Sequence, residues 1–166
     1  MTDSRTFREI LPDLLATQLL AAEVYTLFIS RSTGEEALLW RMMLLEELDH
    51  IRFLADLLEK DTTITADLPP VRLDIIRAIA ERARTNGASS TLERVEEGLR
   101  LEHAEVDFGL EALVAKRLSV SAGVPGYAGR LEDHYRELLG YAMRYRASRD
   151  IGVQIARLEE HLATTV

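Results

Sequence analysis

Apolar residues recur at spacings of three and four along almost the whole of this 166-residue chain. That spacing is the period of an α-helix with one face turned toward a core. The positions in between are rich in residue types that favour helices, and signals for β-strands are scarce. The sequence therefore predicts an all-α protein.

Turn and proline signals divide this pattern into segments of a single domain, which we expect to span residues 1–166. The predicted segments are a helix pair, a connecting helix and a second helix pair, at 6–60, 72–85 and 91–163. Two long helix pairs joined by a shorter helix are the plan of a four-helix bundle. The last helical region forms a C-terminal extension, with a break expected near 148–152.

Local signals define two of these boundaries. Asn86-Gly87 is a natural C-terminal stop for the connecting helix. Ser89 and Ser90 then stand shortly before Glu93, a spacing at which serine and glutamate cap the start of a helix. We therefore expect the second helix pair to begin at Thr91.

The composition excludes several classes of function. Cysteine is absent, so disulfides, zinc ribbons, cysteine-ligated iron–sulfur centres and thiol nucleophiles cannot occur. The formal net charge of −8 argues against nucleic acid as a main partner, because phosphate binding needs a basic face. The N-terminus has no apolar run typical of a signal peptide, and the longest apolar segment contains a glutamate. We therefore expect a cytoplasmic protein with no membrane span.

That glutamate is the only charged residue in the most apolar stretch of the chain. Between Leu14 and Ser30, Glu23 alone carries a charge. An ionised carboxylate in an apolar core is strongly unfavourable unless it is paired or binds a metal. We predict that Glu23 is a metal ligand; the alternative is an ion pair with an arginine such as Arg41 or Arg144.

Other polar side chains also fall on apolar helix faces. Glu47 and His50 are three residues apart in the apolar stripe of their helix, so both can reach one ion. Glu102 and Glu105 repeat this spacing, and His134 lies among leucines. Four helices would then direct carboxylates and histidines into one interior, as in bundles that bind two iron or manganese ions. The alternative for Glu47 and His50 is an ordinary surface pair. The alternative for Glu102 and Glu105 is a solvated acidic face.

The arrangement resembles the ferritin-like superfamily, and within it the rubrerythrin-like branch. The residues that carry the resemblance are Glu23 with Tyr25, Glu47 with His50, and Glu102 with Glu105. The resemblance implies a ferritin-like four-helix bundle with a non-haem site for two iron ions, or for manganese or zinc. It also implies redox chemistry with peroxide or dioxygen, or iron oxidation, with an external electron donor. A homodimer is a further expectation from the resemblance.

The second half of the chain departs from the family pattern. A second Glu-x-x-His ending at His134 would need a glutamate where this chain has Leu131. Glu132 is the nearest carboxylate, and it is displaced by about 100° around the helix. The chain also lacks the four cysteines of the rubredoxin-type iron site in full-length rubrerythrins. Two alternatives follow: a metal-binding protein without turnover, and a helical interaction module with a degenerate site.

Overall fold

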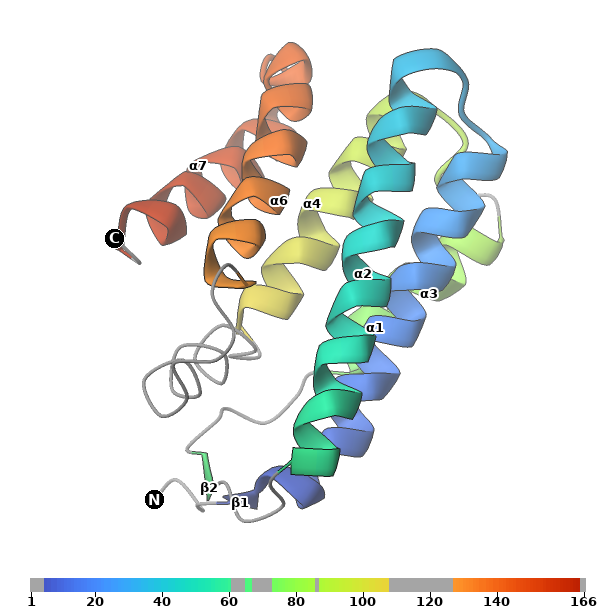
Figure 1. Cartoon of the computed structure of the whole chain (residues 1–166). Coiled ribbons are helices and arrows are strands. Elements are labelled where there is room, and N and C mark those ends of the chain that lie inside the picture. Colours follow the sequence, from blue (N-terminus) through green and yellow to red (C-terminus); the bar gives the residue numbers. More distant parts are fainter. Residues whose placement is uncertain (1–4, 61–64, 67–72, 86, 108–126, 165–166) are drawn as a thin grey trace.

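The computed structural model describes residues 5–60, 65–66, 73–85, 87–107 and 127–164. In this part of the chain it contains six α-helices, a short 3-10 helix and one pair of two-residue strands, so the predicted all-α class is confirmed. The elements are β1 (Arg5–Thr6), α1 (Phe7–Ser30), α2 (Gly34–Lys60), β2 (Thr65–Ala66), α3 (Leu73–Arg84), α4 (Thr91–Asp107), α6 (Tyr127–Ala142), η1 (Met143–Tyr145) and α7 (Arg149–Thr164) (Figure 1).

Helices α1 and α2 form a hairpin, which is the most extensive contact between elements. The turn that joins them is short, and the backbone N–H of Arg31 donates to the carbonyl of Phe28 at 3.1 Å. Gly34 then starts α2 with φ of 59°, in the left-handed region where a side chain would be strained. This turn brings the apolar faces of two long helices against each other.

An aromatic cluster fills the core beside this hairpin. Tyr25, Phe28 and Trp40 are fully buried. The rings of Tyr25 and Trp40 stack with centroids 5.8 Å apart, and Phe28 meets Trp40 edge-on at 5.0 Å. Helix α4 approaches Trp40 closely, because a Cβ atom added at Gly98 would lie 2.9 Å from the indole ring. The glycine therefore sets the distance between α4 and the aromatic cluster.

The predicted cap of α4 is confirmed. Glu93 accepts a hydrogen bond from the backbone N–H of Ser90 at 2.8 Å, and the Ser90 hydroxyl accepts one from the N–H of Glu93 at 3.2 Å. This reciprocal pair is a capping box. Residues 108–126, which belong to the predicted second helix pair, lie outside the described part of the chain.

Helix α1 is long and apolar. By length and composition alone, Glu9–Ser30 could cross a membrane, with a mean hydropathy of 1.2. Half of that window is buried inside the fold, which is what a core helix also shows. The absence of a membrane span stays a prediction from the sequence.

Candidate metal centre

Three buried side chains from α2 and α4 come together in the interior. Glu47, His50 and Glu105 each offer one ligand atom, and these atoms all lie within 4.8 Å of one another. All three residues are buried: Glu47 is 0% exposed, His50 is 3% exposed and Glu105 is 4% exposed. The sequence predicts all three as ligands, and the structure places them in one cluster. A surface pair is thereby excluded for Glu47 and His50.

Gln18 brings a third helix, α1, to this cluster. Its Oε1 lies 2.7 Å from Nδ1 of His50, and its side chain also hydrogen-bonds to Glu105. When Glu105 is ionised, it accepts this bond from the amide NH₂, while the amide oxygen faces His50. Nδ1 of His50 also lies 3.3 Å from Oε2 of Glu47, so this ring nitrogen faces the carboxylates of the cluster.

Glu102 lies one helical turn before Glu105 and is fully buried. Its Oε1 accepts a hydrogen bond from the hydroxyl of Tyr25 on α1. Burial raises the pKa of Tyr25 well above its usual value, and the nearby carboxylates, Glu102 foremost, raise it further. Tyr25 therefore stays a proton donor to Glu102. The solvated acidic face that the sequence left open for the α4 pair is excluded.

The cluster disfavours its own negative charge. Burial raises the pKa of Glu105 well above its usual value, and the charges of Glu47 and Glu102 raise it further. Among the described residues, Oε1 of Glu105 has no hydrogen-bond partner. Three buried carboxylates this close together need protons or a cation to be stable.

Other buried glutamates in the described part of the fold are treated differently. Glu36 binds Arg94 through two hydrogen bonds of 2.6 and 3.0 Å. Glu97 binds Arg82 through two hydrogen bonds of 2.7 and 2.8 Å. Glu36 and Glu97 are thus each paired with an arginine, and Glu47 and Glu105 lie close to His50. Two carboxylates and an imidazole grouped in this way could hold a metal ion.

Glu23, the residue that the sequence places first among the ligands, is not part of this cluster. Its side chain is 41% exposed, and both carboxylate oxygens accept hydrogen bonds of 2.7 Å from Arg84 on α3. Arg84 also lowers the pKa of Glu23 below its usual value. Glu23 therefore forms an ion pair with an arginine, which is the alternative that the sequence left open. The partner is Arg84 and not Arg41 or Arg144.

The remaining candidates belong to α6. Glu132 and His134 lie within this helix, and so does Leu131, but their side chains are outside the described part of the structure. Helix α6 contacts both α2 and α4. Whether these two side chains join the cluster therefore stays a prediction.

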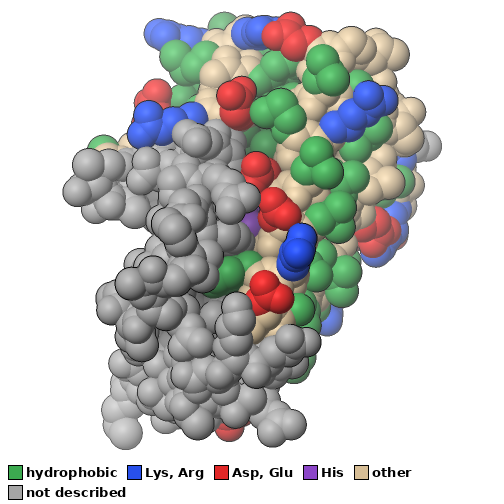
Figure 2. Space-filling view, in the orientation of Figure 1, with side chains coloured by type: hydrophobic (Ala, Val, Ile, Leu, Met, Phe, Trp, Pro, Cys, Tyr) green, Lys and Arg blue, Asp and Glu red, His purple; other side chains and the backbone are tan. Residues whose placement is uncertain are grey.

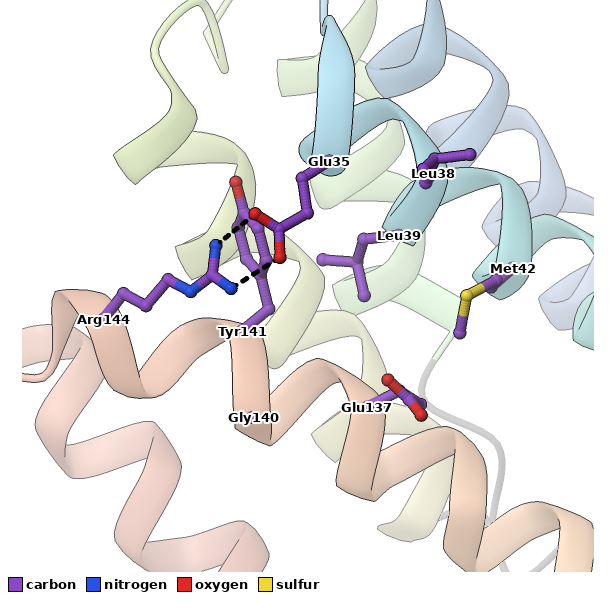
Figure 3. A pocket seen from close by; sticks show the side chains of 8 residues that line it. All are labelled: Glu35, Leu38, Leu39, Met42, Glu137, Gly140, Tyr141 and Arg144. Carbon is purple, nitrogen blue, oxygen red and sulfur yellow. Dashed lines mark hydrogen bonds and ion pairs between the residues drawn. The ribbon is translucent and has the colours of Figure 1, made fainter.

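A separate pocket of about 320 Å³ opens at the surface between α2 and α6. Figure 3 shows an ion pair between Glu35 and Arg144 at one side of it and Glu137 at the other, with apolar residues of α2 between them. Arg144 also lies over the ring of Tyr141, 4.8 Å from its centroid. None of the buried cluster residues lines this pocket, so it is distinct from the candidate metal centre.

The chain was also compared with known proteins. No protein-family model matches it, and neither a curated protein nor a solved structure does. What the protein does must therefore follow from the chemistry of its own residues.

Proposed function

We propose that the protein binds a divalent transition metal ion, iron or manganese, through Glu47, His50 and Glu105. The observation that carries this proposal is the approach of three ligand atoms to within 4.8 Å of one another in a buried, acid-rich cluster. A cation there would balance the charges that burial makes unfavourable. Oε1 of Glu105, which has no hydrogen-bond partner among the described residues, would be available to such an ion.

The donor set favours iron or manganese over copper(I) and calcium. Two carboxylates and one imidazole suit iron, manganese and zinc, whereas copper(I) prefers sulfur ligands and calcium prefers oxygen alone. Glu47 and His50 come from the Glu-x-x-His pattern that di-metal helical bundles use. Zinc is the alternative metal for the same three residues.

The proposal also includes a second metal ion, next to the first. Glu102 is buried next to Glu105, and α6 contacts both helices that carry the ligands. We infer that Glu102, together with Glu132 or His134 of α6, holds this ion. The α1–α2 hairpin and the paired glutamates of α4 support the resemblance to ferritin-like, rubrerythrin-like proteins on which this part rests.

Bound iron would supply redox chemistry with peroxide or dioxygen, using electrons from an external donor. The residues of the chain would position the ligands and limit access of water. Gln18 lies within hydrogen-bond distance of Nδ1 of His50, and Tyr25 holds Glu102 by a hydrogen bond. A carboxamide at Gln18 and an ion-paired Glu23 leave α1 without a carboxylate in the cluster. Metal binding without turnover is therefore the second candidate.

Reaction of the iron-loaded protein with hydrogen peroxide separates these two candidates. Oxidation to ferric iron raises the near-ultraviolet absorbance, and we expect this change in the wild type and in Glu23→Gln. We expect neither bound iron nor the absorbance change in Glu47→Gln. Bound iron that does not react with peroxide would contradict the redox role and support metal binding without turnover.

A further inference from the structure

A stripe of large apolar side chains is exposed along the outer face of α2. Leu38, Met42, Leu45 and Leu48 are 57%, 42%, 63% and 50% exposed. Because they are four, three and three residues apart, they lie on one side of the helix. Figure 2 shows hydrophobic side chains gathered over α2, with acidic and basic ones among them. Exposed apolar patches of this kind mark interaction surfaces in soluble proteins.

The same face carries charges in a pattern that fits a second copy of itself. Arg41 and Asp49 are both exposed, and each is four residues from Leu45, in opposite directions along the helix. At about 100° per residue, both lie within about 40° of Leu45 around the helix. If two α2 helices pair antiparallel about Leu45, Arg41 of each copy comes level with Asp49 of the other.

We propose that two copies of the chain form a homodimer through this α2 stripe, antiparallel, with a twofold axis at Leu45. Leu45 then meets its own counterpart, and Met42 comes level with Leu48 of the second copy. A parallel pairing would instead place Arg41 beside Arg41 and Asp49 beside Asp49. Like charges at an interface are repulsive, so the charge pattern selects the antiparallel arrangement.

The pocket between α2 and α6 adds a complementary feature. Leu38 and Met42 line both the pocket and the α2 stripe, and Glu137 lies at the same pocket (Figure 3). In the antiparallel arrangement, Arg52 of the second copy comes level with Leu38. An exposed arginine is thus brought to the rim of a pocket that contains a carboxylate.

The proposed dimer is independent of metal binding. Glu47 and His50 are buried on the side of α2 that faces the interior, whereas Leu45 is 63% exposed on the opposite side. A change at Leu45 should therefore alter the mass of the particle and leave its metal content unchanged. Failure of the dimer and failure of the metal site can be told apart by measuring both.

Light scattering during size-exclusion chromatography tests the proposal. The expected mass of the full-length wild type is twice 18.7 kDa, about 37 kDa. Leu45→Glu should reduce it to the 18.7 kDa of one chain. Val153→Glu is the matched control, because Val153 is 47% exposed on α7, away from the stripe, and this variant should stay dimeric. A monomeric wild type, or a dimer that Leu45→Glu leaves intact, would overturn the proposal.

Two further variants test the orientation. Arg41→Asp should weaken the dimer by placing two acids at each contact, and the double variant Arg41→Asp with Asp49→Arg should restore it. Since the chain has no cysteine, Leu45→Cys introduces a single thiol that should form an intermolecular disulfide on oxidation. Val153→Cys should not. A swapped pair that fails to restore the dimer, or equal cross-linking at both cysteines, would contradict the antiparallel interface.

Discussion

At the scale of single residues, Gln18 has the most specific role in the cluster, because it touches two proposed ligands at once. Its amide oxygen faces Nδ1 of His50, and its side chain also hydrogen-bonds to Glu105. Residues that orient metal ligands in this way contribute about 10–100-fold to metal affinity. Gln18 is therefore a positioning residue for both ligands.

Gln18→Met keeps the length of this side chain and removes the amide. We expect the affinity for manganese to fall by about 10–100-fold, measured by titration against a competing chelator. Thr17→Val is the control, because Thr17 is also buried but its hydroxyl bonds to Asp13 within its own helix. An unchanged affinity in Gln18→Met would show that the amide does not position the ligands.

The cluster residues that could be predicted from the sequence are those whose helical spacing places them on one face. Glu47 and His50 share a face by their spacing of three, and their apolar neighbours indicate that this face is buried. Glu23 could not be assigned in this way, since its partner Arg84 is 61 residues along the chain on another helix. Gln18 carries no charge and is not a metal-ligand type, so its role could not be predicted from the sequence, although it is a polar residue in an apolar stretch.

At the scale of helices, a buried ion pair joins α2 to α4. Burial alone would raise the pKa of Glu36, but hydrogen bonds from Arg94, Trp40 and Thr91 outweigh it and lower the pKa from 4.5 to about 2. A pKa lowered by folding means that the carboxylate stabilises the fold above pH 4.5. This contribution is lost as the pH falls from 4.5 toward 2.

Glu36→Gln should lower the free energy of unfolding by about 3–5 kcal/mol at pH 7, because it leaves Arg94 buried without its counter-charge. The loss, measured by urea denaturation, should shrink as the pH approaches 2. Glu35→Gln is the neighbouring control, since its ion pair with Arg144 is exposed and should contribute little. Equal effects of the two changes would contradict the assigned importance of the buried pair.

The contact between α4 and the aromatic cluster gives a second prediction for helix packing. In Gly98→Ala the new methyl group would lie 2.9 Å from the indole ring of Trp40, which is fully buried and cannot move freely. We expect a loss of about 1–3 kcal/mol in the free energy of unfolding. In Gly140→Ala nothing lies within 4 Å of the new methyl, and we expect a gain of about 0.5–1 kcal/mol. A stable Gly98→Ala protein would show that the helices are not in close contact here.

Helix boundaries were predictable where a local signal defines them. The Ser90 and Glu93 cap is an example, because it depends on neighbouring residues alone. The break in the last helical region falls at residues 143–148, slightly earlier than the sequence suggests. Gly152 lies inside α7, and its N–H donates to the carbonyl of Ser148 at 2.9 Å. The helix therefore continues through Gly152, although the sequence suggested a helix break at this residue.

At the scale of the whole molecule, a bound cation should stabilise the fold. A ligand that binds the folded chain alone raises its stability with ligand concentration, by about 2.7 kcal/mol at 100 times the dissociation constant. Because its ligands come from α2 and α4, the ion would join two helices that are distant in sequence. The all-α class followed from periodicity along the chain, whereas this link could be seen only once the helices were placed together.

Manganese should therefore raise the Tm of the wild type, and the rise should grow with manganese concentration. Measured by differential scanning fluorimetry, Glu105→Gln should show no comparable shift, because a carboxamide does not replace the ligating carboxylate. Glu23→Gln should respond like the wild type. A manganese-induced rise in Tm of the same size in Glu105→Gln would indicate that the ion binds elsewhere.

The central claim is that Glu47, His50 and Glu105 bind a metal ion and that Glu23 does not. Elemental analysis of the full chain after anaerobic loading with ferrous iron and desalting tests it most directly. We predict at least one iron per chain in the wild type and the same amount in Glu23→Gln, with iron lost in Glu105→Gln. A wild type that retains no iron, or a Glu105→Gln variant that retains as much as the wild type, would contradict the account.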